Sequence, residues 1–262
     1  MKTTKILMIG NSFSQDTAKF LSQTAQASGA DVMVTTLYIG GCPLERHWHN
    51  IETGEAAYQH ELNGVITDRK ISIPEAVHEE DWDYIVTQQA SHDSGWIESY
   101  EPFLGLITEY LRKEAPGAKL LLQETWAYEP DSPHFNFMRY NRDQKLMYRK
   151  LDSCYRAMAE KYGWTLIPSG TIIQKIREAD GSPFNREQGG ISICRDGFHM
   201  GWVYGRYLLA CIWTRILFGA SLKENTFVPS RHGLEAADES ILAAIRGYVD
   251  ELICFFQQRH LG

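Results

Sequence analysis

The sequence predicts an α/β fold, a three-layer α/β/α sandwich around a central, mostly parallel, five-stranded sheet. Short runs rich in apolar and β-branched residues alternate with longer segments in which apolar residues recur every three or four positions. Strands that alternate with helices in this way form a parallel sheet with helices on both faces. The length of 262 residues and the hydrophobic content of 44% suit one core, so we expect residues 1–262 to form a single domain.

Five apolar runs are the predicted strands, at residues 4–9, 32–38, 84–88, 119–123 and 165–167. Segments with helical periodicity are the predicted helices, at residues 18–27, 102–113, 144–162, 171–179, 202–217 and 236–258. Three longer segments interrupt this alternation, at residues 40–82, 124–143 and 180–200. Each adjoins the carboxyl end of a predicted strand, where open α/β sheets bind their ligands, so we expect function to reside there.

The composition argues against several classes of protein. Lys and Arg total 26 against 33 Asp and Glu, a net charge of −7, and the basic stripe of a nucleic-acid binder is missing. The five cysteines are odd in number and widely spaced, which argues against a disulfide framework and favours a reducing compartment. The sequence has no run of about 18 apolar residues, so we expect no membrane span. No secretory leader is visible, so we expect a cytoplasmic protein, or a periplasmic or secreted one if a leader was removed.

The first predicted strand ends in Gly10-Asn11-Ser12, shortly before a helical segment. A strand that turns sharply into a helix would place Ser12 at the carboxyl edge of the sheet, beside the N–H groups of a helix N-terminus. A serine in that position is a candidate nucleophile. The rest of the chain must then supply a base, an orienting acid and donors for an oxyanion.

A candidate base and acid occur together in Asp196-Gly197-Phe198-His199, directly before the helix predicted at residues 202–217. An Asp and a His three positions apart can share one face of a single turn. Asp196 can then accept a hydrogen bond from one imidazole nitrogen while the other nitrogen faces Ser12, which fixes the tautomer and stabilises the imidazolium. Such pairs also occur as simple helix caps, so the inference depends on their combination with Ser12.

Four blocks of the sequence stand out, at residues 10–14 (GNSFS), 39–48 (IGGCPLERHW), 88–92 (QQASH) and 196–199 (DGFH). Together they resemble the SGNH (GDSL-type) serine hydrolase superfamily, and more closely a bacterial subgroup with a Gly-Asn-Ser-Phe-Ser opening. They span essentially the whole chain in the order of the superfamily. The resemblance implies a flavodoxin-like sandwich with Ser12 as nucleophile, His199 as general base and acid, and Asp196 as its orienting partner.

The resemblance also implies an oxyanion hole. The second block of the superfamily supplies a glycine N–H, and Gly41, with Gly40 as the alternative, fits that place, while the N–H of Ser12 is a second donor. The third block usually reads Gly-x-Asn-Asp, and its Asn side chain donates to the oxyanion. This chain departs from that pattern, because counting from Asp83 without gaps places His92 at the Asn position. The alternative side-chain donors are therefore His92, Gln89 and Gln88.

Residues after the second predicted strand are candidates for contact with a substrate. Gly40, Arg46 and His47 lie there, and Arg46 could bind an anion or a hydroxyl group. His47 and His49 could together ligate a metal, but no third ligand is identifiable, so we expect no metal site.

Trp126 opens a segment at residues 126–140 that is unusually aromatic for a loop. Aromatic faces beside a site commonly hold sugar rings, although the same residues could simply pack against the sheet. Because acetyl-ester chemistry is common in the superfamily that the chain resembles, this segment favours Trp126 as a contact to a decorated carbohydrate.

These features predict a serine esterase that hydrolyses short-chain, acetyl-type esters of a small molecule or a carbohydrate through an acyl-enzyme, without a cofactor. The alternative is an SGNH-type protein that has lost useful turnover through its altered third block and binds a glycan or small molecule. A nucleotide-binding flavodoxin-like protein is disfavoured, because neither a P-loop nor a G-x-G-x-x-G motif follows the first strand. We expect neither nucleic acid nor a membrane as a partner.

Overall fold

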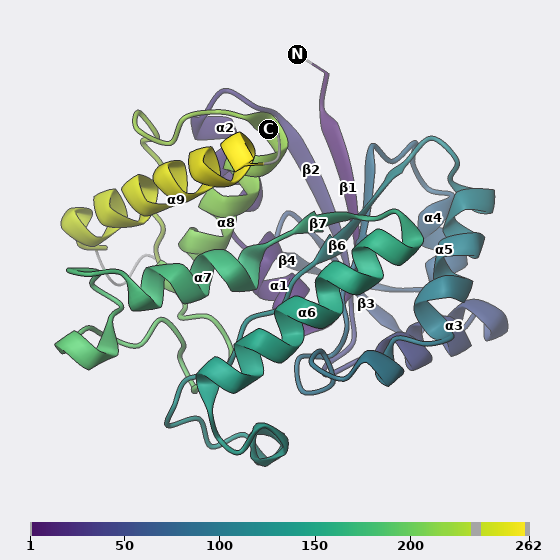
Figure 1. Cartoon of the computed structure of the whole chain (residues 1–262). Coiled ribbons are helices and arrows are strands. Elements are labelled where there is room, and N and C mark those ends of the chain that lie inside the picture. The colour runs from purple at the N-terminus through teal and green to yellow at the C-terminus, as the bar shows by residue number, and fades with distance from the viewer. Residues whose placement is uncertain (1, 232–236, 260–262) are drawn as a thin grey trace.

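The computed structural model describes residues 2–231 and 237–259, and these residues form a seven-stranded sheet flanked by helices (Figure 1). β1 (Thr4–Gly10) lies inside the sheet and pairs in parallel with β2 (Val32–Tyr38) and β5 (Tyr84–Thr87). β6 (Lys119–Gln123) and β7 (Thr165–Ile167) extend the parallel part beyond β5. The strand order, β4-β3-β2-β1-β5-β6-β7, changes direction at β1, which is where such sheets bind ligands.

Two antiparallel strands at one edge overturn the prediction of five strands. β3 (Tyr58–Leu62) pairs with β2, and β4 (Val65–Ile71) pairs with β3. The two-residue turn between them, Asn63 and Gly64, has positive φ angles of 49° and 71°, as Asn-Gly hairpins require. The prediction is wrong because β4 is a largely exposed edge strand with three charged residues, so its apolar pattern is weak.

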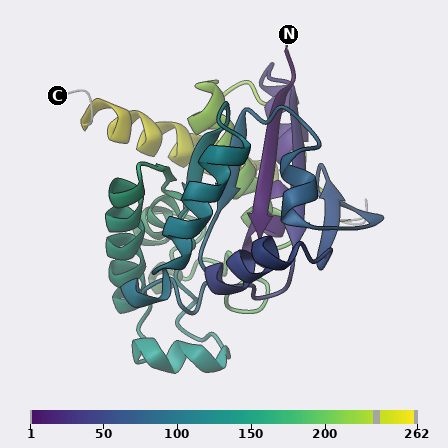
Figure 2. The ribbon, with the colours of Figure 1, turned by 90° about the vertical axis from the view of Figure 1, so that its right-hand side faces the viewer.

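The helices cover both faces of the sheet, which confirms the three-layer sandwich (Figures 1 and 2). One layer contains α1 (Ser12–Ala18), α2 (Leu21–Ala27), α8 (Tyr204–Phe218) and α9 (Glu239–Arg259). The other contains α3 (Leu44–Thr53), α4 (Ile73–Val77) and α5 (Phe103–Glu114). α6 (Gln144–Tyr162) and α7 (Ser169–Glu178) meet near the β7 edge. Because both faces are covered, residues 6–9 of β1 are at most 1% exposed.

The helix boundaries follow local signals that the sequence only partly revealed. The single helix predicted at residues 18–27 is wrong in its start and its continuity, because α1 already begins at Ser12 and residues 19 and 20 separate it from α2. α6 ends where predicted, since Gly163 has the left-handed φ of 66° that commonly ends helices. The predicted start of the last helix, Ala236, lies outside the described residues. None of the described helices is both long and apolar enough to cross a membrane.

Candidate active site

β1 leads directly into α1, and the turn between them places Ser12 at the first position of the helix. Asn11 caps the helix, because its Oδ1 accepts a hydrogen bond from the N–H of the second helical residue at 3.0 Å. Its Nδ2 donates to the carbonyl of Cys42 at 3.2 Å and so ties the cap to the segment after β2. Gly10 is required before the cap, since a Cβ there would lie 2.0 Å from the Oγ of Ser14.

The structure brings His199 and Asp196 to Ser12. The Nε2 of His199 lies 2.8 Å from the Oγ of Ser12, and its Nδ1 lies 2.7 Å from the Oδ2 of Asp196. The other carboxylate oxygen of Asp196 accepts from the backbone N–H groups of His199 at 2.8 Å and Phe198 at 3.2 Å. Since an ionised carboxylate only accepts, His199 carries its proton on Nδ1 and can accept the Ser12 proton on Nε2.

The charge state of Asp196 follows from these contacts. Burial of Asp196 opposes its ionisation, but hydrogen bonds from the ring and backbone of His199 outweigh it, so the pKa of Asp196 lies below its ordinary value. The Asp196 side chain is 39% exposed and that of His199 is 20% exposed. The three groups therefore lie at a partly open surface, which a substrate can reach.

A tight turn after β2 is bonded to the residues just before Ser12, since the N–H of Ile39 donates to the carbonyl of Gly10 at 3.3 Å. It runs from Ile39 to Cys42 and is closed by a 3.3 Å hydrogen bond from the N–H of Cys42 to the carbonyl of Ile39. Gly41 is its third residue and has a φ of 62°, a conformation that favours glycine. Within the described residues, the N–H groups of Ser12, Gly40 and Gly41 donate no hydrogen bond to the protein. They can therefore donate to an oxyanion.

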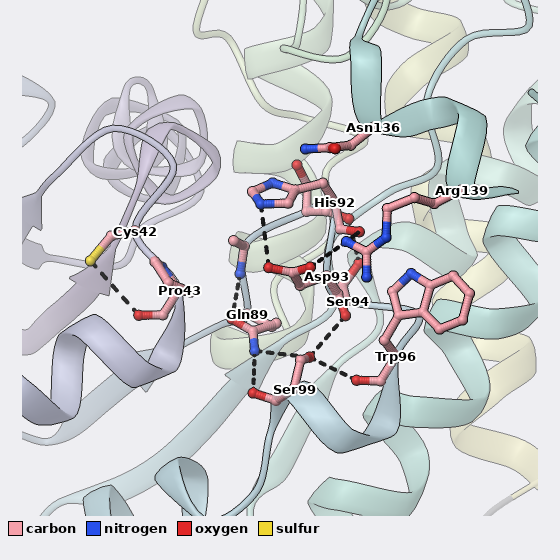
Figure 3. A network of polar contacts seen from close by, with 12 residues as sticks. Cys42, Pro43, Gln89, His92, Asp93, Ser94, Trp96, Ser99, Asn136 and Arg139 are labelled. Atoms are coloured by element: carbon pink, nitrogen blue, oxygen red, sulfur yellow. Dashed lines mark hydrogen bonds and ion pairs between the residues drawn. The ribbon is translucent and has the colours of Figure 1, made fainter.

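The amide of Gln89 is fully used within the loop after β5, so the prediction that it is an oxyanion donor is wrong (Figure 3). Its Nε2 donates to the carbonyl of Ser99 at 2.7 Å and to the Oγ of Ser99 at 3.0 Å. Its Oε1 accepts from the N–H of Leu44 at 3.0 Å and of Ala90 at 2.8 Å. The alternative, Gln88, is fully buried and donates to the Oδ1 of Asn11 at 2.8 Å.

His92 lies at the open end of the same loop and contacts charged neighbours (Figure 3). Its Nε2 lies 3.3 Å from the Oδ2 of Asp93, which also forms an ion pair with Arg139. The His92 side chain is 25% exposed, so it stays accessible. Its role as an oxyanion donor stays a prediction.

Of the two residues predicted to contact substrate on α3, one is accessible and one is not. Arg46 is exposed. His47 is 0% exposed, its Nδ1 lies 2.8 Å from the hydroxyl of Tyr58, and burial, with a smaller effect of Arg46, lowers its pKa to about 3. The prediction for His47 is therefore wrong, because it is a neutral core residue that connects α3 to β3. Among the described residues, no three His, Cys, Asp or Glu side chains are grouped to hold a metal.

Trp126 was also predicted to contact substrate, and this is wrong because the side chain is 0% exposed. Its ring stacks on Phe13 with 4.1 Å between centroids, and its Nε1 donates to the carbonyl of Phe198 at 2.7 Å. These two residues are the chain neighbours of Ser12 and His199. Trp126 thus supports the backbone on both sides of the serine–histidine pair.

The aromatic segment that Trp126 opens has a buried part and an exposed part. Tyr128, Phe137 and Tyr140 are 0% exposed and pack in the core. Phe135, the first residue of the 3₁₀ helix η2 (Phe135–Tyr140), is 78% exposed. The packing interpretation therefore holds for the buried residues, whereas a sugar contact in this segment stays a prediction.

Sequence reasoning missed His134, which borders the site. Its ring packs against Phe198 with 4.8 Å between centroids and against Tyr128 with 4.9 Å. Burial, together with the neighbouring His92 and His199, lowers the pKa of His134. No motif contains this residue, and its position within the aromatic segment was the available signal.

The architecture is that of the SGNH hydrolases. A proposed SGNH hydrolase from Slackia heliotrinireducens is similar with a TM-score of 0.53 and 20% sequence identity, over 82% of this chain and 98% of that one. An acetyl xylan esterase gives a TM-score of 0.54 and 14% identity, over 81% and 99% of the two chains. At these identities the similarity establishes the fold alone.

The chain belongs to the DUF4886 family, described as a domain of unknown function, whose family model matches residues 5–246. A crystal structure of a DUF4886 family protein from Bacteroides uniformis is similar with a TM-score of 0.85 and 33% identity, over 97% of this chain and 96% of that one. The comparison with curated proteins found no match.

Proposed function

We propose that this protein is a serine hydrolase that acts on ester bonds. The observation that carries the proposal is the series of contacts from the Oγ of Ser12 to His199, 2.8 Å, and from His199 to Asp196, 2.7 Å. Nucleophile, base and orienting acid in hydrogen-bond reach are the requirements for covalent acyl transfer. The names of two proteins with this fold, an acetyl xylan esterase and a lipase/acylhydrolase from Enterococcus faecalis, support the same chemistry.

In the acylation step, the Oγ of Ser12 attacks the ester carbonyl carbon and its proton passes to the Nε2 of His199. The carbonyl oxygen becomes an oxyanion in a tetrahedral intermediate, and Asp196 stabilises the imidazolium. When the intermediate collapses, the bond to the alcohol oxygen breaks and His199 returns the proton to that oxygen. The alcohol leaves and the acyl group remains on Ser12.

Deacylation repeats the same steps with water. His199 takes a proton from the water molecule, whose oxygen attacks the acyl carbon, and a second tetrahedral oxyanion forms. Its collapse breaks the bond to Ser12, and His199 returns the proton to the Oγ. The products are one alcohol and one carboxylic acid, and no cofactor takes part in either step.

The N–H groups of Ser12 and Gly41 are the proposed backbone donors to the oxyanion, and His92 is the proposed side-chain donor. Loss of one such donor typically costs about 2.7–4 kcal/mol of transition-state stabilisation. An enzyme with two backbone donors therefore retains substantial activity even where a third donor is weak, as it is for a His92 that also faces Asp93.

We infer that the substrate is a short-chain, acetyl-type ester of a carbohydrate. The exposed ring of Phe135 supports a sugar contact, because it follows His134, which packs on the neighbour of His199. The exposed Arg46 on α3 offers donors to hydroxyl groups from another element. The name of the acetyl xylan esterase with the same fold is consistent with this class of substrate.

The test compares wild type with Ser12→Ala on p-nitrophenyl esters of increasing chain length and on acetylated xylo-oligosaccharides. We expect wild type to prefer acetyl esters and Ser12→Ala to lose at least about 10³-fold in kcat. Ser22→Ala, on the neighbouring helix α2, is the matched control and should retain wild-type activity.

Active-site labelling separates hydrolysis from simple binding. A fluorophosphonate should add its mass to the tryptic peptide of residues 6–19, and Ser12→Ala should prevent the addition. Wild type that neither hydrolyses an ester nor takes up the label contradicts the proposal. Retained binding of acetylated oligosaccharides in that case would favour the alternative of a glycan-binding protein.

A further inference from the structure

We propose that Asp16 is a positioning residue that holds the turn with Asp196 and His199 against the helix with Ser12. Its effect on catalysis rests on the proposed hydrolase function, whereas its effect on the geometry of His199 does not. Asp16 lies four residues after Ser12 in α1, on the same side of the helix one turn later, and is 0% exposed.

The Asp16 carboxylate binds both flanks of the turn. Its Oδ2 accepts from the N–H of Met200, the residue after His199, at 2.9 Å. Arg195, the residue before Asp196, donates through Nη1 to Oδ1 at 2.9 Å and to Oδ2 at 3.0 Å. Displacing His199 from Ser12 therefore requires breaking contacts of Asp16 on at least one side of the turn.

The turn itself is closed, so that it moves as one unit. The N–H of Arg195 donates to the carbonyl of His199 at 2.9 Å, and the Nη1 of Arg195 donates to the carbonyl of Met200. Cys194 and Met200 form an isolated antiparallel bridge at its base. Trp126 and the N–H of Glu129 hold the middle of the turn, at the carbonyls of Phe198 and Gly197, and Asp16 is the attachment that ties its two ends to the helix with Ser12.

The attachment is a buried ion pair between the Asp16 carboxylate and two guanidinium groups. The Nε of Arg206, on α8, donates to the Oδ1 of Asp16 at 2.8 Å, and the side chains of Arg206 and Arg195 are only 8% and 15% exposed. The ring of Trp202 covers both guanidinium groups at 4.4 Å and 4.1 Å. Little water can therefore compete for the carboxylate.

A purely structural role explains these contacts less well. Well-packed apolar residues often stabilise a fold as much as a buried ion pair does. No apolar side chain, however, could accept the N–H of Met200 and so define where His199 lies. A displacement of about 1 Å at a reacting group can cost about 10²-fold in rate, so precise placement has a direct catalytic effect.

The test is Asp16→Asn, with two readouts. We expect kcat for an acetyl ester to fall by about 10- to 100-fold while KM changes by less than about twofold, because the base is displaced but the substrate surface is not. In ¹⁵N-histidine NMR spectra, the Nε2 signal of His199 should shift in the variant because its contact with the Oγ of Ser12 is weakened, whereas Nδ1 should stay protonated because Asp196 moves with His199.

The matched control is Asp250→Asn. Asp250, on α9, also pairs with an arginine, Arg215, at 3.0 Å and accepts from a backbone N–H, that of Leu222, at 3.1 Å. It should lower the stability of the protein through loss of a comparable ion pair, but leave kcat and the Nε2 signal of His199 unchanged. If Asp16→Asn does not fold, Arg195→Lys replaces it, because lysine keeps the charge but cannot bridge Asp16 and Met200 in the same geometry.

The outcomes separate the two proposals. A folded Asp16→Asn variant with wild-type kcat and a wild-type Nε2 signal of His199 overturns the positioning role. If wild type neither hydrolyses esters nor takes up a fluorophosphonate, the hydrolase proposal fails, and the NMR comparison alone still decides whether Asp16 positions His199.

Discussion

Two segments flank Ser12 at the carboxyl edge of the sheet, and they are held in different ways. The turn at residues 195–200 is attached through buried charges, the carboxylate of Asp16 and two guanidinium groups. The loop at residues 88–99 is built by a neutral amide, since Gln89 bonds Leu44, Ala90 and Ser99. The comparison teaches that the two segments use their polar groups differently. The base His199 is positioned from α1, the helix that carries Ser12, whereas the Gln89 amide, near the expected third oxyanion donor, fixes the shape of its own loop.

The largest expected effect tests the charged side of this comparison. Asp196→Asn should lower kcat by about 10³–10⁴-fold, because an amide favours the wrong tautomer of His199. Stability should change little, since the Asp196 side chain is 39% exposed. Steady-state kinetics and the rate of fluorophosphonate labelling measure the loss. Asp93→Asn, in the opposite segment, is the control and should change kcat by less than tenfold; equal losses in both variants would remove the distinction between the two sides.

A third segment of the same edge, after β6, holds a buried carboxyl group that accepts hydrogen bonds from a threonine. Burial, with a smaller contribution from Asp152, raises the pKa of Glu124 to about 8, although two hydrogen bonds from Thr171 lower it. The folded state thus binds a proton that the unfolded state releases above about 4.5. The free energy of unfolding should therefore fall by on the order of 3–5 kcal/mol as pH rises from about 4.5 to about 8.

Glu124→Gln removes this titration, and its amide oxygen can still accept a hydrogen bond from the N–H of Thr171. Urea unfolding at pH 5 and pH 8 should show a flatter pH dependence for the variant than for wild type. The same slope in both proteins would mean that Glu124 is already ionised in the folded protein.

Gln89→Leu tests the neutral side of the comparison. It removes four hydrogen bonds inside a buried loop, so the free energy of unfolding should fall by about 2–4 kcal/mol. The kcat of the folded protein should change by less than tenfold, because this amide has no free hydrogen for an oxyanion. A hundredfold loss of kcat at unchanged stability in urea would instead make Gln89 a catalytic donor.

The smallest effect is expected at His92. His92→Ala should lower kcat by about tenfold, about 1.4 kcal/mol, since the imidazole shares its Nε2 proton with Asp93. Because the side chain is partly exposed, thermal unfolding should hardly change. A loss of more than 10²-fold would show that His92 stabilises the oxyanion as strongly as the backbone donors do. Both segments that flank Ser12 would then contribute directly to catalysis.

Much of this architecture could be predicted because the central strands are buried on both faces. The strands β2 and β6 have the predicted boundaries, since most of their residues are buried, and the boundaries of the edge strand β7 are also as predicted. β3 and β4 could not be recognised from apolar content, as Val65 and Ile66 are exposed. The Asn63-Gly64 dipeptide was nevertheless a usable hairpin signal.

The residues of the site also fall into a predictable group and a group that could not be predicted. The motifs and the resemblance to the SGNH superfamily together predicted that Ser12, His199 and Asp196 act as a unit, and they meet because the turn after β1 and the turn before α8 lie at one edge of the sheet. Spacing alone could not tell which aromatic or polar side chains point outward. His47, Trp126 and Gln89 are buried for reasons of packing and hydrogen bonding between distant segments, which only the folded chain reveals.

The position of Ser12 and Asp16 on one turn of α1 also has a mechanical consequence. When the helix shifts as a rigid body, it carries the nucleophile and, through Met200, the imidazole in the same direction. The separation of the two reacting atoms should then fluctuate less than the position of either atom. Heating should therefore leave Ser12 and His199 aligned in each folded molecule until α1 detaches. The loss of activity and the thermal unfolding of the protein should then occur at the same temperature.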